Sequence, residues 1–268
     1  ALKPLLPGTQ FMGMSMAIVN DHAEWFEYFL NAKNHQPGIP LDWITYHCYA
    51  SANSQQKFED YEYAVYDKAE SFINTVSYIE NIRRRLSPNT KTDINELGTF
   101  VNEEMRKQPI PPTYWNLSAS VYAYFFIELS KQGIDVIGES QLVGFPTQFP
   151  DVSLINYENN KPNARYWVLK LIRDNIHSGC SIIRTAIHGN TGEDLLAQGF
   201  IDHGVKKILL INKRNKTASI KLPAVYTGAK ISTIDSVSGD HAAIGSIVKD
   251  QTLQLNPFSV HLIVLKNQ

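Results

Sequence analysis

The sequence has few cysteines, almost no excess charge and no long apolar run, and each of these absences excludes a class of protein. Cys48 and Cys180 are the two cysteines among 268 residues, too few for a disulfide scaffold and without the spacing of a zinc site. A formal net charge of -1 argues against broad attraction to nucleic acid or to an anionic membrane. No apolar stretch reaches the roughly 20 residues that span a bilayer. We therefore expect no metal, no nucleic-acid partner and no membrane span.

Other signals are missing at the start of the chain and after its predicted strands. No glycine-rich phosphate loop follows a strand, so we expect no nucleotide or other cofactor. Ala1 begins the sequence without a methionine or a charged-then-apolar leader, which suggests a processed start. Asn116-Leu117-Ser118 and Asn215-Lys216-Thr217 match the glycosylation acceptor pattern, although such triplets also arise by chance. Together these features favour a secreted glycoprotein or one in a lysosome-like compartment.

Strand and helix patterns alternate four times in the first two thirds of the chain. Asp21 is expected to cap the first helix. Predicted strands cover residues 11–19, 41–49, 92–100 and 134–141. The first predicted helix follows Asp21 and ends before His35, and the other predicted helices cover 58–86, 114–132 and 165–176. This rhythm predicts parallel strands joined by crossover helices.

After Gly179 the pattern changes to short alternating runs separated by turn signals such as His188-Gly189-Asn190. Predicted strands there cover residues 181–187, 199–203, 206–212, 218–222, 229–236 and 260–266, with no helical stretch between them. This part is expected to be a β-sandwich. The predicted domains are therefore residues 1–178 and 179–268.

Four βα units make half of a (β/α)8 barrel. Half a barrel leaves two open sheet edges and an uncovered apolar face, a liability for an independent domain. We therefore expect the barrel to be completed by the N-terminal half of the same precursor, cut by a protease to give a heterodimer, or by another chain. An independent open-sheet domain with a binding function is the alternative, since a doubly wound sheet of four strands could survive alone.

The run Thr92-Asp93-Ile94-Asn95-Glu96-Leu97-Gly98-Thr99-Phe100 ends a predicted strand in an acid and a glycine. Barrel strands present catalytic carboxylates at their carboxyl ends in this way. Strict alternation along the strand predicts that Thr92, Ile94 and Glu96 share one face. Glu96 could then point into the mouth of the barrel.

The order of the strand-end motifs carries a family resemblance that spans nearly the whole chain. The motifs are Tyr46-His47-Cys48-Tyr49, Asn95-Glu96-Leu97-Gly98, Gly138-Glu139-Ser140-Gln141, Ser153-Leu154-Ile155-Asn156-Tyr157 and Pro162-Asn163-Ala164-Arg165-Tyr166-Trp167. In this order they resemble the C-terminal half of heparanase-like and β-xylosidase-like retaining glycosidases, whose barrel feeds into a β-sandwich. The resemblance implies strands 5–8 of the barrel and a carbohydrate substrate. A basic cluster near Glu96 is missing, which departs from heparanase and argues against a sulfated polyanion.

The resemblance also implies roles for individual residues. Glu96 matches the nucleophile on the seventh strand, and the acid/base glutamate of the family follows a fourth strand that this sequence lacks. Substrate contacts are implied for Asn95, Glu139 and Gln141, and contacts to the substrate or to Glu96 are implied for His47 and Tyr49. Glu139 is also a candidate proton donor, because it too ends a strand.

Several alternatives stay open at the level of sequence. His47 and Tyr49 could be packed core residues, and Glu139 could be a rim glutamate paired with a base. Trp43, Tyr114, Trp115 and Trp167 could stack on a sugar, although aromatic residues at barrel ends are more often core. The leading hypothesis is a retaining β-glycosidase. A catalytically inactive protein on the same scaffold, with a glycan-binding, storage or structural role, is the alternative.

Overall fold

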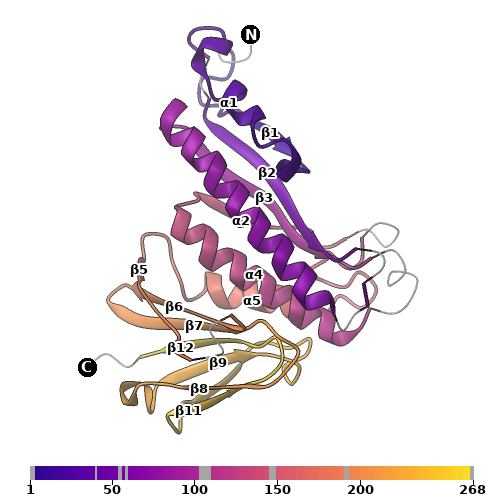
Figure 1. Cartoon of the computed structure of the whole chain (residues 1–268), viewed down its shortest axis with the longest axis vertical. Helices are drawn as coiled ribbons and strands as arrows, with labels where there is room; N and C mark the ends of the chain where they lie inside the picture. Colours follow the sequence, from indigo (N-terminus) through magenta and orange to yellow (C-terminus); the bar gives the residue numbers. More distant parts are fainter. Residues whose placement is uncertain are drawn as a thin grey trace.

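The computed structural model of the chain describes residues 4–39, 41–53, 56–57, 60–102, 110–144, 149–189 and 193–265. It consists of a parallel sheet with helices, followed by an antiparallel β-domain (Figure 1). This confirms the fold class predicted from the sequence. The start predicted for the second helix at Phe58, the turn residue Asn190 and the strand end at Lys266 lie outside the described residues.

The parallel sheet has four strands in the order β1-β2-β3-β4. They are β1 (Met12–Met16), β2 (Trp43–Ser51), β3 (Lys91–Phe100) and β4 (Val136–Glu139). Each pairs in parallel with its neighbour. Parallel pairing brings the carboxyl ends of all four strands to the same end of the sheet, which is where the strand-end motifs of the sequence therefore meet.

In the described residues, four α-helices connect or follow these strands: α1 (Trp25–Phe29), α2 (Tyr61–Leu86), α4 (Pro112–Gln132) and α5 (Ala164–Arg173). Helix α4 begins with Pro112, whose missing N–H costs nothing in the first turn, and ends at Gly133, which adopts φ 77°. The predicted capping role of Asp21 is wrong. Asp21 lies in the short 3-10 helix η1 (Val19–Asp21), and Glu24 precedes α1 without a side-chain cap.

Helices α2 and α4 cover one face of the parallel sheet (Figure 1). Tyr46 of β2 packs edge-on against Phe72 of α2, and Phe72 packs in the same way against Phe125 of α4. Beneath them, buried Glu80 of α2 pairs with Arg83 and accepts a 2.5 Å hydrogen bond from Thr92 of β3. The hydrophobic core of this part therefore lies between the sheet and the two long helices.

The β-domain begins after α5 and contains a six-stranded and a two-stranded antiparallel sheet. The larger sheet has the order β10-β9-β12-β7-β6-β5, and the smaller pairs β11 with β8. The strands are β5 (Ser181–Ile183), β6 (Leu195–Asp202), β7 (Val205–Asn212), β8 (Ala218–Lys221), β9 (Lys230–Ile234), β10 (Ile244–Ile247), β11 (Thr252–Leu255) and β12 (Val260–Val264). The described residues also form the 3-10 helices η2 (Ala32–Asn34) and η4 (Ala224–Tyr226).

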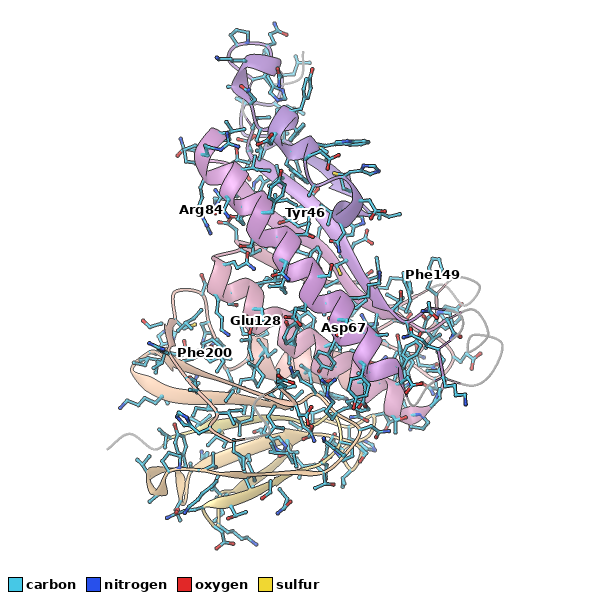
Figure 2. All side chains as sticks on the ribbon, in the orientation of Figure 1. Tyr46, Asp67, Arg84, Glu128, Phe149 and Phe200 are labelled. Carbon is cyan, nitrogen blue, oxygen red and sulfur yellow. The ribbon has the colours of Figure 1, made fainter. Side chains whose placement is uncertain are left out.

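A second apolar cluster joins the helices to the six-stranded sheet. Ala123 and Ile127 of α4 and Val168 of α5 are buried in one cluster with Phe200 and Leu209 of the β-domain. Figure 2 shows Phe200 on the side of the β-domain that faces the helices. The helices therefore have apolar neighbours on two sides.

Both outer strands of the parallel sheet have an open edge. Within the described residues, β1 pairs only with β2 and β4 pairs only with β3. Met12 of β1 and Val136 of β4 are large apolar residues that remain exposed at these edges. No helix in the described part of the chain is long and apolar enough to cross a membrane.

Candidate active site

The side chain of Glu96 reaches the uncovered face of the sheet because β3 contains an irregularity. Tyr46 pairs with Ile94 while the next residue, His47, pairs with Glu96, so β3 has one extra residue at Asn95. The pairing with β4 shifts over the same stretch. Ile94 and Leu97, three positions apart, both join the core on the helix side. Such a β-bulge reverses the alternation of the strand.

The predicted placement of Thr92, Ile94 and Glu96 on one face is therefore wrong. Thr92 and Ile94 face the helices, where Thr92 bonds to Glu80. Glu96 lies on the opposite face beside His47 and Tyr49. The bulge thus places Thr92 and Ile94 on the helix side of β3 and the Glu96 carboxylate on the opposite side.

Tyr49 holds the carboxylate of Glu96 through a short hydrogen bond. The Tyr49 hydroxyl donates to Glu96 Oε2 over 2.5 Å and lies 2.6 Å from Ser140 Oγ. Burial and the bond to Glu96 raise the pKa of the Tyr49 phenol well above its usual value. The phenol therefore keeps its single proton for Glu96, and the Ser140 hydroxyl donates the second bond.

His47 lies on the other side of the same carboxylate oxygen. Its Nδ1 atom is 3.6 Å from Glu96 Oε2. The Glu96 side chain is 41% exposed and the His47 side chain 14% exposed. Glu96 is thus hydrogen-bonded to Tyr49, lies close to His47 and still reaches solvent.

A cavity of about 610 Å³ opens over Glu96. Glu96, His47, Tyr49 and Gln141 all line it, so the structure brings four of the predicted site residues together. Its wall also contains Phe100, which stacks on Tyr49 with ring centroids 4.3 Å apart, and Phe149 next to it. Figure 2 shows Phe149 near the end of the sheet at which β2 and β3 finish.

Several polar atoms near the site are buried without a hydrogen-bond partner in the described residues. His47 Nε2 and Gln141 Oε1 belong to residues that line the cavity, whereas Asn95 Oδ1 belongs to the bulge residue of β3, which does not line it. Gln141 lies two residues after β4 and adopts φ 37°, in the left-handed region that a non-glycine residue seldom occupies. Buried polar groups normally have partners, so the atoms of His47 and Gln141 offer hydrogen-bonding positions to a polar ligand.

Glu139 does not reach the cavity. Its side chain is 1% exposed and forms an ion pair with Arg165 of α5, whose side chain is 0% exposed. Burial raises the pKa of Glu139 to about 7, and the Arg165 guanidinium acts in the opposite direction. A pKa near neutrality suits a proton donor, but a group buried behind the sheet end cannot reach a glycosidic oxygen. The structure therefore favours the paired rim glutamate over a direct substrate contact.

The aromatic residues singled out in the sequence lie away from the cavity wall. Tyr114 is buried in the core, where its hydroxyl bonds to Thr99, and Trp167 donates to the carbonyl of Asp240 in the β-domain. Trp43 lies at the start of β2 and Trp115 in α4. The aromatic residues that line the cavity are instead Tyr49, Phe100 and Phe149, and sequence reasoning did not select the two phenylalanines. No signal in the sequence set these two phenylalanines apart.

The two glycosylation triplets differ in their surroundings. Asn116 is 4% exposed within α4, so the folded chain leaves no room for a glycan there. Asn215 is exposed in the turn between β7 and β8, where its backbone N–H donates to Glu62 of α2. Only the second position is open to a glycan.

No protein-family model matches the sequence, and no curated protein matches it. Solved structures do resemble it. The GH51 arabinofuranosidase from Xanthomonas axonopodis pv. citri aligns with TM-score 0.65 and 15% identity over 97% of this chain and 59% of its own. A GH30 endoxylanase from Clostridium papyrosolvens aligns with TM-score 0.57 and 14% identity over 97% and 57%.

A conserved exported protein from Bacteroides fragilis also aligns, with TM-score 0.56 and 15% identity over 84% of this chain and 46% of its own. At these identities the likeness shows the fold alone. The chain has a glycoside hydrolase-like fold, and it spans less than two thirds of the length of each of these proteins.

Proposed function

We propose that this chain carries the nucleophile of a retaining β-glycosidase and that the nucleophile is Glu96. One observation carries the proposal. Glu96 lies in the C-terminal half of the parallel strand β3, turned by a bulge toward the open face, bonded to Tyr49 and exposed to a cavity of about 610 Å³. A retaining glycosidase needs a carboxylate in that position.

The geometry supports the first half of a double displacement. The free oxygen of Glu96 attacks the anomeric carbon as the bond to the leaving oxygen breaks and the acid/base group protonates that oxygen, giving a covalent glycosyl-enzyme ester. Tyr49, bonded to Oε2, keeps the carboxylate oriented. Water then attacks the anomeric carbon, Glu96 leaves as carboxylate, and the general acid/base group takes the proton from water.

The acid/base carboxyl group is the part that we assign to a polypeptide outside this sequence. Retaining enzymes hold the two carboxyl groups about 5 to 5.5 Å apart. Glu139 is buried against Arg165. Asp21 lines the cavity from the exposed turn after β1, and in the described residues no hydrogen bond or ion pair is found between it and Glu96. The open edges of β1 and β4 suit a further four-stranded half.

We infer that the whole protein is a complete (β/α)8 barrel with a β-sandwich domain. Residues 1–178 form the second half of a (β/α)8 barrel, residues 179–268 form a β-sandwich domain, and the first half comes from the same precursor or from a second chain. Similarity to an exported protein and the exposed Asn215 support a secreted or lysosome-like compartment. Of the two acceptor triplets, we propose that the one at Asn215 carries the glycan, because Asn116 is buried.

The substrate contacts follow from the atoms that lack partners. His47 Nε2 and Gln141 Oε1, on residues that line the cavity, offer positions for sugar hydroxyl groups, and Phe149 offers a ring face. Asn95 does not line the cavity, and its proposed contact rests on its place beside Glu96 in the motif. Among the described residues that line the cavity, Lys68 is the single lysine or arginine. This favours a neutral sugar over a polyanion.

A fluoro-sugar inactivator with a dinitrophenolate leaving group tests the assignment. This leaving group departs without protonation, so the reaction needs the nucleophile and not the absent proton donor. A panel of 2-deoxy-2-fluoro glycosides that includes arabinosyl, xylosyl and glucosyl reagents covers the uncertainty about the sugar. Mass spectrometry should find the added sugar on the peptide that contains Glu96.

Two variants sharpen the experiment. Glu96→Gln should abolish labelling, while Asp21→Asn, which alters the other carboxylate of the cavity, should leave it intact. Labelling of Asp21 or of any other residue would sink the assignment of Glu96.

A glycan-binding protein without catalysis is the second candidate, favoured by the presence of a single well-placed carboxylate. In that case the chain binds the sugars of the panel, as seen by calorimetry, and none of the reagents forms a covalent adduct. The Gln141→Ala variant should then weaken binding, because it removes one of the unpartnered acceptors.

A further inference from the structure

Next to the site, the buried Arg165 contacts two of the segments that lie close to Glu96 and its partner Tyr49. The guanidinium of Arg165 pairs with Glu139 at the end of β4 and donates to the Ser140 carbonyl over 3.2 Å. It also donates to the carbonyls of Asp151 and Val152. Helix α5 thus reaches both the end of β4 and the loop that contributes Val152 to the cavity wall.

The same guanidinium lies next to Tyr49. A Cβ atom added to Gly98 of β3 would lie 3.1 Å from the Tyr49 ring and 3.3 Å from Arg165 Nη2. Because Gly98 has no side chain, the tyrosine and the arginine approach the strand from the same side. The Arg165 charge also lowers the pKa of Tyr49, against the larger effects of burial and the Glu96 bond.

We propose that Arg165 is a positioning residue for the nucleophile, acting through Glu139 and Ser140 on the phenol of Tyr49. Arg165 fixes the backbone at 139–140, Ser140 Oγ meets the Tyr49 hydroxyl at 2.6 Å, and that hydroxyl donates to Glu96 at 2.5 Å. A continuous series of contacts therefore connects α5 to the carboxylate. The proposal rests on the assignment of Glu96 as the site's reactive group.

The ion pair between Arg165 and Glu139 leaves some of its own hydrogen-bonding groups unsatisfied, which argues against a purely stabilising role. Arg165 Nε and Glu139 Oε2 are buried without a hydrogen-bond partner in the described residues. Replacing a buried ion pair with apolar side chains of similar volume is often neutral or stabilising. What an apolar pair cannot supply is a fixed hydrogen-bonding direction at Ser140, and that direction is what Tyr49 needs.

Proton NMR of the chain tests this without any substrate. A phenol proton held in a 2.5 Å bond to a carboxylate exchanges slowly with water and resonates far downfield, and its absence from Tyr49→Phe assigns it. In Ser140→Ala, which removes one hydroxyl and keeps the backbone, we expect this proton to exchange about tenfold faster. In Arg165→Lys we expect a similar change, because lysine keeps the charge and loses the planar fork.

Lys170→Gln is the matched control. Lys170 lies on the same helix, is 45% exposed and pairs with Asp174, so its replacement should leave the exchange rate unchanged. Ser140→Ala should also keep the wild-type melting temperature, which separates positioning from general damage. The proposal is overturned if wild-type protein shows no such proton, or if Ser140→Ala and Arg165→Lys exchange it within twofold of the wild-type rate.

The fluoro-sugar reagent gives a second readout. Ser140→Ala should lower the rate constant for labelling Glu96 about tenfold and leave the reagent concentration at half-maximal rate unchanged. An unchanged rate constant counts against positioning. Failure of labelling in the wild-type chain counts against the proposed function alone, since the NMR measurement needs no sugar.

Discussion

Replacing Glu139 with glutamine should remove a pH dependence from the stability of the fold. In the folded chain, burial raises the pKa of Glu139 to about 7, whereas the usual value is 4.5. Between these two pH values the folded protein keeps a proton that the unfolded chain has released. The free energy of unfolding should therefore fall as pH rises through this window.

The magnitude follows from the size of the shift. A gap of about 2.5 pH units corresponds to about 3 kcal/mol at about 1.4 kcal/mol per unit. The side chain is 1% exposed, so solvent does not reduce this figure much. Above about pH 7, where Glu139 is ionised in the folded chain, Glu139→Gln also leaves Arg165 buried without its ionic partner, which should cost about 3 to 5 kcal/mol. The raised pKa of Glu139 is therefore tested by how the stability difference changes with pH, and not by the loss of stability in Glu139→Gln.

Urea unfolding of wild-type protein and Glu139→Gln at several pH values between about 4.5 and about 7.5 measures the effect. The difference between the two proteins cancels other titrating groups. His261 is such a group: burial lowers its pKa to about 4, so its contribution to stability falls as pH decreases. His261→Gln should accordingly give a difference curve of opposite slope. A difference between wild type and Glu139→Gln that stays constant across the window would refute the raised pKa.

Two further substitutions test packing. Gly98→Ala should cost about 1 to 3 kcal/mol and slow the labelling of Glu96, because the new methyl group meets the Tyr49 ring at 3.1 Å; urea unfolding and the fluoro-sugar reagent check both effects, and unchanged labelling would show that Tyr49 tolerates the displacement. Phe72→Ala should cost about 3 to 5 kcal/mol, since Phe72 is 1% exposed between Tyr46 and Phe125. The control Tyr78→Ala on the same helix changes a 46% exposed side chain, and a similar cost for both would contradict the packing argument.

The alternation of strands and helices was predictable from the sequence because each element carries its own local signal. Proline at the start of α4 and Gly133 at its end are such signals, and α4 (Pro112–Gln132) lies where the pattern of residues 114–132 predicted a helix. The predicted bounds of β4 were less accurate, since the strand covers Val136–Glu139 and the prediction covered residues 134–141. Gln141 leaves the strand with a positive φ angle, which the apolar pattern does not reveal.

The orientation of Glu96 could not be predicted by the same reasoning. Alternation is a rule for a regular strand, and the extra residue at Asn95 exists only in relation to the register of β2 and β4. The grouping of His47, Tyr49, Glu96 and Gln141 around one cavity agrees with what the strand-end motifs led us to expect. Their roles remain predictions until labelling tests them.

The burial of Glu139 was also out of reach, because its partner Arg165 lies 26 positions further along the chain. The sequence marks both residues as parts of motifs, but not as a pair. Glu139 is turned away from the cavity by its pairing with a buried guanidinium, whereas Glu96 is turned toward it by the bulge of β3. A pattern of residue types along the chain does not contain that information.

The apolar cluster shared by α4, α5 and the six-stranded sheet limits how the chain can be recombined. Phe200 and Leu209 of the β-domain are buried against Ile127 and Val168 of the helices. A β-domain transplanted onto another barrel would lose these contacts unless α4 and α5 moved with it. The unit that can be exchanged between proteins is therefore the β-domain together with α4 and α5. If residues 1–178 and 179–268 are expressed separately, each part should aggregate, because each exposes its share of the apolar cluster.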